Sequence, residues 1–196
     1  MTKTILAVLF SAGLGAQTLP AKPGLYAVFQ TSEGTITARL FEREVPIATR
    51  TFVNLAQGTQ PWRDAKGNVV KRPFYENMIF HRVLPKLMIQ SGDPTGTGAH
   101  NCGFTIHDEF LPGLRFDQSG KLAMANTGAS DSGGCQFFIT TDMMPQWSGK
   151  YTIFGQVVSG LEVAEKISKA KVIGDKPVEP AKLIHVSIER VGPVKK

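Results

Sequence analysis

Arg82 is the charged residue whose surroundings most need a chemical explanation. It lies in the run FHRV, where Phe80 and Val83 favour burial on an alternating strand. A guanidinium there must either pair with a carboxylate or face a cleft, because an unpaired buried charge is costly. In a cleft it would donate charge-assisted hydrogen bonds to a bound molecule. The run by itself leaves both interpretations of Arg82 open.

Six further residues have side chains that could complete such a cleft. Apolar side chains would line a small pocket, and amide side chains would fix the orientation of a bound molecule. The three apolar residues are Leu87, Met88 and Phe138, and the three amides are Gln90, Asn126 and Gln136. Taken singly, each of them could equally be an ordinary core or turn residue.

Other catalytic chemistries find little support in the sequence. The segment GDPTGTG is glycine-rich, but it lacks the lysine and the Ser/Thr of a phosphate-binding loop, so we expect a turn there. His100 and Cys102 lie two residues apart, yet the other histidines have no metal-ligand spacing, so no metal is expected. A hydrolase nucleophile at Cys135 would need a histidine brought close by folding, and the sequence indicates none.

Composition is that of an ordinary globular domain. The 196 residues, 42% of them hydrophobic and 19% charged, are enough for one well-buried core. The formal net charge is +6, but the lysines and arginines are scattered, and no run of them alternates with stacking aromatic residues. We therefore expect no nucleic-acid partner.

Apolar patterning predicts the elements that would hold the candidate side chains. The stretch 25–41 has the pattern of a β-hairpin around SEG, and Pro46 opens a helix that Gly58 ends. A second helix is predicted over residues 161–170. The polar stretch 59–73 is expected to be an exposed loop, which could also recognise one specific partner.

Short apolar or alternating runs make up most of the remaining chain. They include MIFHRVL, KLMIQSG, KLAMAN, CQFFITT and YTIFGQVV, with LIHVSIERV as a final strand. Strands and helices do not alternate, which argues against a parallel doubly wound sheet. Many short strands separated by turns predict a mainly β protein, a barrel capped by helices.

Several of these runs follow one another in an order that resembles the cyclophilin family of peptidyl-prolyl cis/trans isomerases. The motifs are FHRVLPKLMIQSGDPTGTG, MANTG, CQFFIT and YTIFGQV, and the resemblance covers about residues 26–191. It implies a closed eight-stranded antiparallel β-barrel capped by two α-helices, with the substrate groove on its outer face. It also implies rotation of X-Pro peptide bonds, which assists protein folding, without a metal, nucleotide or other cofactor.

The resemblance assigns roles to individual positions. Arg82 matches the catalytic arginine of the family, Gln90 matches the glutamine that orients it, and Asn126 is grouped with them. Nine positions match the substrate groove: His81, Leu87, Met88, Ala125, Thr127, Gln136, Phe138, Trp147 and Tyr151. Among these, Met88 and Phe138 match the floor of the proline pocket.

Four positions differ from the best-known eukaryotic pattern. Leu87 replaces a phenylalanine, Gln146 stands where a tryptophan is usual, Trp147 replaces a leucine, and Tyr151 stands where histidine is common. The pocket keeps an apolar wall, so we expect catalysis to survive. The family's tryptophan donates a hydrogen bond to the cyclic peptide drug cyclosporin, so we expect only weak binding of this drug.

Cys102 and Cys135 are too few for a disulfide-rich scaffold or a four-ligand zinc site. In cyclophilins their positions border one secondary pocket, so the resemblance implies that they could form a single disulfide. Two unrelated buried thiols are the alternative. A bridge could persist in an exported protein, whereas a reducing cytosol would keep both thiols free.

The N-terminal residues resemble a targeting segment. A short basic start precedes the mostly apolar stretch 4–14 and two small residues, an order typical of a signal peptide over residues 1–16. Cleavage could fall as late as Ala21, and residues 22–196 would form the cyclophilin-like domain. We then expect a bacterial protein exported to the periplasm or secreted, without membrane attachment. If the segment is instead an N-terminal arm, a cytoplasmic protein is expected.

The implied partners are proline-containing peptides and unfolded proteins, which the backbone of Ala125 and Asn126 would help to hold. We expect a monomer. The main alternative function is a non-catalytic proline-binding chaperone or scaffold. That function would need the groove but not an arginine poised over the peptide bond, so the presence of Arg82 favours an enzyme.

Overall fold

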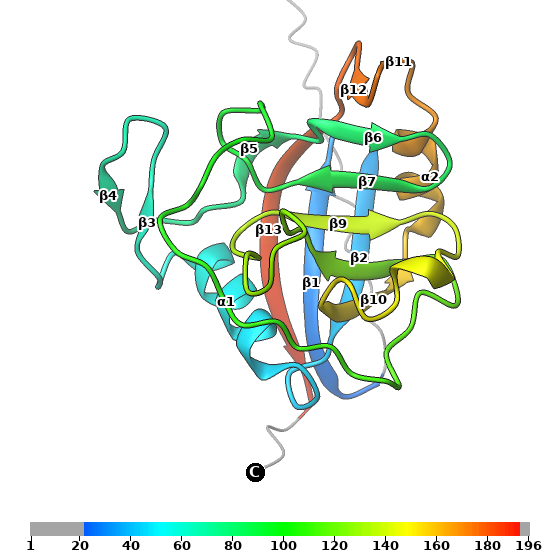
Figure 1. The fold of residues 1–196 in the computed structure, drawn as a ribbon, viewed down its shortest axis with the longest axis horizontal. Helices are drawn as coiled ribbons and strands as arrows, with labels where there is room; N and C mark the ends of the chain where they lie inside the picture. The colour runs from blue at the N-terminus through cyan, green and yellow to red at the C-terminus, as the bar shows by residue number, and fades with distance from the viewer. Residues whose placement is uncertain (1–21, 193–196) are drawn as a thin grey trace, which may run out of the picture.

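A strongly curled antiparallel sheet of nine strands forms the body of the protein (Figure 1). The structure is a computed structural model that describes residues 22–192. The strand order is β5-β13-β1-β2-β10-β8-β9-β7-β6. The strands are β1 (Gly24–Thr31), β2 (Gly34–Leu40), β5 (Glu76–Ile79), β6 (Arg82–Leu84), β7 (Met88–Ser91), β8 (Lys121–Met124), β9 (Phe137–Thr140), β10 (Ile153–Ser159) and β13 (Lys182–Val191).

The first two strands confirm the predicted hairpin. They pair along their whole length, from Leu25 opposite Leu40 to Thr31 opposite Gly34. The hydroxyl of Thr31 donates a 2.7 Å hydrogen bond to the carbonyl of Gly34, and Gly34 has a φ of 134°. Glycine suits this position because other residues rarely adopt such a φ.

Both predicted helices are present, on different parts of the sheet (Figure 1). Helix α1 (Pro46–Ala56) begins at the predicted proline and packs against β13 and β10, and the carboxylate of Glu109 accepts N–H groups of its first turn. Helix α2 (Leu161–Ser168) packs against β2, β6 and β7. It ends two residues earlier than predicted and follows Gly160, where a side chain would collide with the backbone of β2.

The predicted mainly β fold with two helices is confirmed, but the sheet has nine strands instead of eight and does not close into a barrel among residues 22–192. The run MIFHRVL breaks at Phe80 and His81 into β5, which pairs with β13, and β6, which pairs with β7. These two strands end the sheet on opposite sides, and no pairing joins them within residues 22–192. The run breaks because its first half pairs at one end of the sheet and its second half at the other, and only Phe80 and His81 connect β5 to β6.

The strands β7 and β9 divide their side chains between two apolar clusters. Ile89 and Phe137 belong to the main core, whereas their neighbours Met88 and Phe138 belong to a smaller cluster. This division follows from the two-residue period of a β-strand, which sends successive side chains to opposite faces. The same strands therefore build both the core and a separate apolar surface.

Two small hairpins lie in segments for which the sequence predicted no strand. The stretch 59–73, expected to be an exposed loop, contains β3 (Trp62–Arg63) and β4 (Val69–Val70). Its Trp62 is buried, and the indole N–H donates a 2.9 Å hydrogen bond to the carbonyl of Arg72, so only part of the stretch is exposed. A second hairpin, of β11 (Val172–Ile173) and β12 (Lys176–Pro177), lies beside β6 (Figure 1).

Candidate active site

A row of aligned residues crosses three neighbouring strands. Arg82 on β6 is opposite Gln90 on β7, and Gln90 is opposite Phe138 on β9. Arg82 Nη1 donates to Gln90 Oε1 at 3.3 Å, and Gln90 Nε2 donates to Gln136 Oε1 at 2.9 Å. Gln136 Nε2 in turn donates to the carbonyl of Gly98 at 3.1 Å. The two amides therefore connect the arginine to the glycine-rich turn by a continuous chain of hydrogen bonds.

Arg82 pairs with a carboxylate, which is the first of the two interpretations that its sequence context left open. Its Nε donates a 2.7 Å hydrogen bond to Asp175 Oδ2 and forms an ion pair with that carboxylate. Its side chain is nevertheless 43% exposed, so the guanidinium is also accessible from solvent. The hydrogen bond from Arg82 holds the pKa of Asp175 below its usual range, which keeps the carboxylate charged at neutral pH.

The smaller apolar cluster, which we call the aromatic pocket, lies next to this row. Trp147 and Tyr151 stand at 90° and 84° to the Phe138 ring, at centroid distances of 5.6 and 5.2 Å. Phe116 stacks on Phe138 at 5.9 Å, and Met88 is buried in the same cluster. Such edge-to-face contacts hold aromatic rings in fixed orientations. The arrangement gives an apolar cluster of fixed geometry, in which Met88 and Phe138 are almost fully buried.

A cavity of about 310 Å³ lies on the other side of the two amides. Its lining includes Gln90, Gln136, Ala125, Asn126, Cys102 and Cys135. In the described part of the chain, the backbone N–H and C=O of Asn126 have no hydrogen-bond partner. Its side-chain Nδ2 donates to the carbonyl of Lys150 at 2.9 Å, which fixes the residue. The open backbone groups of Asn126 are available to an extended peptide.

A disulfide joins Cys102 and Cys135 at the edge of this cavity, across 33 residues of sequence and a Cα–Cα distance of 6.2 Å. Cys135 directly precedes Gln136, and the carbonyl of Cys135 accepts a 2.9 Å hydrogen bond from the hydroxyl of Tyr75. The bridge therefore ties the segment after the glycine-rich turn to the residue that precedes Gln136, the groove amide.

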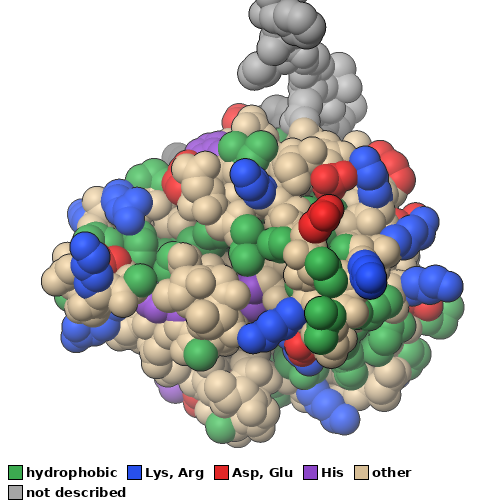
Figure 2. Space-filling view, turned by 90° about the horizontal axis from the view of Figure 1, so that it is seen from above, with side chains coloured by type: hydrophobic (Ala, Val, Ile, Leu, Met, Phe, Trp, Pro, Cys, Tyr) green, Lys and Arg blue, Asp and Glu red, His purple; other side chains and the backbone are tan. Residues whose placement is uncertain are grey.

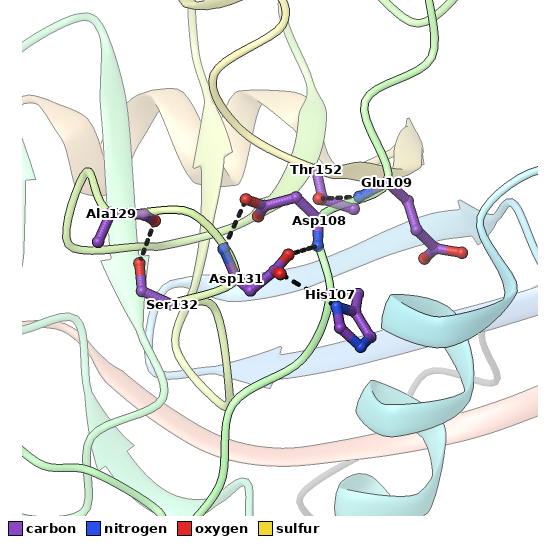
Figure 3. A network of polar contacts seen from close by, with 7 residues as sticks. All are labelled: His107, Asp108, Glu109, Ala129, Asp131, Ser132 and Thr152. Carbon is purple, nitrogen blue, oxygen red and sulfur yellow. Dashed lines mark hydrogen bonds and ion pairs between the residues drawn. The ribbon is translucent and has the colours of Figure 1, made fainter.

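A polar clamp surrounds Ser132, which lines the cavity (Figure 3). Asp108 and Asp131 each accept a 2.8 Å hydrogen bond from the backbone N–H of the other, and His107 Nδ1 lies 3.0 Å from Asp131 Oδ2. The backbone N–H of Asp108 and the His107 ring lower the pKa of Asp131. Ser132 Oγ accepts from the N–H of Thr127 at 3.1 Å, which positions this exposed residue at the cavity rim.

His81 lies behind the groove, and only 5% of it is exposed. Within residues 22–192 neither ring nitrogen has a hydrogen-bond partner, and burial lowers the pKa of His81 although the charge of Asp93 opposes this shift. Its ring lies close under Gly98, where a Cβ would be 3.4 Å away. The ring is therefore neutral at pH 7 and supports the glycine-rich turn by packing.

Asp93 organises the glycine-rich turn itself. One of its carboxylate oxygens accepts from the N–H and the hydroxyl of Thr95, both at 2.7 Å, and the other accepts from the N–H of Gly98 at 2.6 Å. These hydrogen bonds outweigh the effect of burial and lower the pKa of Asp93. The turn predicted for GDPTGTG is thus present, built around a carboxylate rather than a phosphate.

The structure brings the predicted groove residues together except His81, which is buried behind the glycine-rich turn, and it adds neighbours that sequence reasoning missed. Leu87 packs against the aromatic pocket, as do Trp147 and Tyr151, whereas Gln146 is exposed. Phe116 and Asp175 were not predicted to belong to the site. Phe116 lies in a segment without strand or helix periodicity, so no local pattern indicated it. The Gly174-Asp175 pair is a turn signal, but a turn signal does not reveal which residue the turn will contact.

Charged side chains are dispersed over the surface. Figure 2 shows lysine and arginine side chains at separate places on one face, with acidic and apolar groups between them. The described residues contain no cluster of three or more His, Cys, Asp or Glu side chains that could hold a metal ion. Across residues 22–192 no helix combines the length and apolar character needed to span a bilayer.

Comparisons with known proteins agree with this geometry. The family model described as cyclophilin type peptidyl-prolyl cis-trans isomerase/CLD matches residues 26–188. Peptidyl-prolyl cis-trans isomerase A of Mycobacterium tuberculosis is 41% identical over 167 residues, which are 83% of this chain and 91% of that protein. Peptidyl-prolyl cis-trans isomerase-like 1 of Aspergillus fumigatus is 39% identical over 169 residues, which are 84% of this chain and 96% of that protein.

A solved structure shows the same fold. It is a cyclophilin type peptidyl-prolyl cis-trans isomerase from Cryptosporidium parvum, crystallised in the presence of the dipeptide Ala-Pro. The TM-score is 0.72 at 30% sequence identity, and the match covers 85% of this chain and 99% of that one. The family match, the relatives and the fold all extend over most of the chain. The chain therefore belongs to the cyclophilin-type peptidyl-prolyl cis-trans isomerase family.

Proposed function

We propose that this isomerase rotates X-Pro bonds at the junction of the Arg82 guanidinium and the aromatic pocket around Phe138. The observation that carries the proposal is the row across β6, β7 and β9, which puts a half-exposed arginine two strands from Phe138 in the apolar cluster. Neighbouring strands lie about 4.8 Å apart, so the two groups are about 10 Å apart at the backbone. An arginine side chain spans much of that distance, so both can contact one bound proline.

The chemistry requires an interaction that is strongest in the transition state. Rotation of an X-Pro amide removes the double-bond character of its C–N bond, over a barrier of about 20 kcal/mol. As resonance is lost, the proline nitrogen becomes pyramidal and can accept a hydrogen bond. Arg82 would donate that bond while the pocket holds the ring and the preceding carbonyl turns. No covalent intermediate or cofactor is needed.

The required rate gain is within reach of these groups. An acceleration of about 100,000-fold corresponds to about 7 kcal/mol of transition-state stabilisation. A charge-assisted hydrogen bond from Arg82, positioning in a preformed pocket and exclusion of water could together supply this. The backbone N–H and C=O of Asn126, which lines the cavity, would form hydrogen bonds to a peptide there and so add affinity.

Exchange NMR on a short X-Pro peptide tests these roles. Arg82→Ala should reduce turnover by at least tenfold while the peptide Kd changes little, because the arginine bond forms mainly in the transition state. Arg50→Ala, an exposed arginine on α1, is the matched control and should leave both values unchanged. Unchanged turnover in Arg82→Ala would refute the assignment. Peptide binding without acceleration by the wild type would favour a proline-binding chaperone.

We further propose export to the periplasm or outside the cell, with newly translocated, unfolded chains as clients. Support comes from the signal-peptide order of residues 1–16, which lie outside the described residues, and from the disulfide, which persists in oxidising compartments. Intact-mass measurement of the protein from its native source should give a chain that starts after Ala16 or as late as Ala21. A chain that starts at Met1 or Thr2 would exclude cleavage.

A further inference from the structure

Asp175 lies in a segment that has no assigned role in the groove. It occupies the turn of the β11/β12 hairpin, where Ile173 pairs with Lys176 across Gly174 and Asp175. Gly174 has a φ of 66°, the left-handed conformation that such a two-residue turn needs at its first central position. The turn chemistry therefore places Asp175 at the hairpin tip by local preference alone.

The hairpin tip is anchored to β6 by its backbone. The carbonyl of Asp175 accepts a 2.8 Å hydrogen bond from the N–H of Val83, the residue after Arg82. Strand β6 is at the end of the sheet, so this contact covers an N–H group of an edge strand. The base of the hairpin closes through a 2.8 Å hydrogen bond from the N–H of Val178 to the carbonyl of Lys171. Two backbone hydrogen bonds therefore hold the hairpin that presents the Asp175 carboxylate.

The guanidinium is held at two of its atoms. Asp175 accepts from Arg82 Nε at 2.7 Å, and Gln90 accepts from Nη1 at 3.3 Å. A guanidinium has five N–H groups. These two hydrogen bonds use two of them, so three remain without a partner in the described part of the chain. Two contacts on one planar group fix its orientation as well as its position.

We propose that Asp175 is a positioning residue for the isomerase, which orders the Arg82 guanidinium before the substrate binds. The proposal rests on the proposed role of Arg82. Asp175 would act only through the arginine, by keeping Nε occupied and the remaining N–H groups directed away from the hairpin. Without it, Arg82 would be tethered by Gln90 alone and would sample more rotamers. The ordering would then occur during the reaction and slow it.

The charge of Asp175 has a second, opposing effect, which is small here. A paired carboxylate weakens the positive potential that Arg82 offers to the substrate. Both side chains are 43% exposed, so solvent and salt screen their mutual attraction. Orientation by the hydrogen bond should therefore outweigh the loss of potential. Asp175→Asn separates the two effects because asparagine keeps an oxygen acceptor for Arg82 Nε and removes the charge.

The test measures turnover and peptide Kd separately by exchange NMR for Asp175→Ala and Asp175→Asn. We expect Asp175→Ala to lower turnover by about fivefold to tenfold with Kd within about twofold, and Asp175→Asn to retain most activity. Lys176→Ala, an exposed neighbour in the same hairpin, is the control and should behave as wild type. Relaxation of the Arg82 Nε–H signal should show greater motion in Asp175→Ala only.

A double-mutant cycle separates this proposal from a general loosening of the structure. In an Arg82→Ala background, Asp175→Ala should have no further effect on the residual rate, because the residue acts through the arginine. Turnover of Asp175→Ala within twofold of Lys176→Ala would overturn the proposal, as would an equal loss in both backgrounds. If Arg82→Ala itself keeps full turnover, the proposed role of Arg82 fails first. If only the Asp175 variants keep it, Arg82 stands and Asp175 does not.

Discussion

Replacing Cys102 and Cys135 together with alanine should lower the free energy of unfolding by about 4 kcal/mol. The bridge closes a loop between two cysteines that are 33 positions apart in the sequence. In the chain-entropy treatment, removing a cross-link of that length restores about 12 cal/mol/K to the unfolded chain, which is about 4 kcal/mol at 25 °C. Both cysteines are almost fully buried, so alanine also leaves a small void, which adds to the loss.

Urea denaturation followed by fluorescence of the two tryptophans would measure this loss. With a slope of about 2 kcal/mol/M, the unfolding midpoint should fall by about 2 M, while the slope itself changes little if the native fold is kept. Wild type treated with reductant should approach the double variant. The double variant should not respond to reductant, which controls for other effects of the reagent.

The bridge should matter less to the chemistry than to stability. It ties the cavity edge next to Gln136, but Arg82 lies on β6, and Phe138 is held by the pairing of β9 with β7 and β8. We therefore expect turnover of the double alanine variant to fall by less than about fivefold under conditions where it stays folded. A stability loss below about 1 kcal/mol would refute the entropic reasoning. A complete loss of turnover in folded protein would show that the bridge holds the catalytic groups themselves.

Two further predictions concern the glycine-rich turn and the drug site. Asp93→Asn should cost about 1–3 kcal/mol of stability, because an amide NH₂ would face N–H donors. The folded pKa of Asp93 is depressed below its ordinary 3.8, so its contribution is full above that pH and disappears as pH falls through the folded pKa. The stability gap between wild type and Asp93→Asn in urea titrations should thus narrow below about pH 4 and not at pH 8. For cyclosporin, calorimetry should show weak binding that Gln146→Trp strengthens, since position 146 lacks the indole donor; a nanomolar Kd for the wild type would contradict this.

Local sequence patterns were sufficient for the elements that depend on local physics. Pro46 begins α1, the alternation in 25–41 forms the β1/β2 hairpin, and the apolar spacing after Gly160 forms α2. Each of these depends on residues close in the chain, through backbone conformation or the period of a helix or strand. The ordered motifs from FHRV to YTIFGQV also identified the family, because many positions had to agree at once.

Strand closure and the surroundings of Arg82 depended on the tertiary structure. The run MIFHRVL looked like one strand, and only its two sets of partners, β13 and β7, show that it serves both ends of the sheet. Asp175 is 93 residues from Arg82 along the chain, so no periodicity could connect them. Whether Arg82 was a structural ion pair or a groove residue could not be decided from its neighbours. Only the fold shows its ion pair with Asp175, because burial and pairing are set by which distant segments meet, and those contacts leave no local pattern in the sequence.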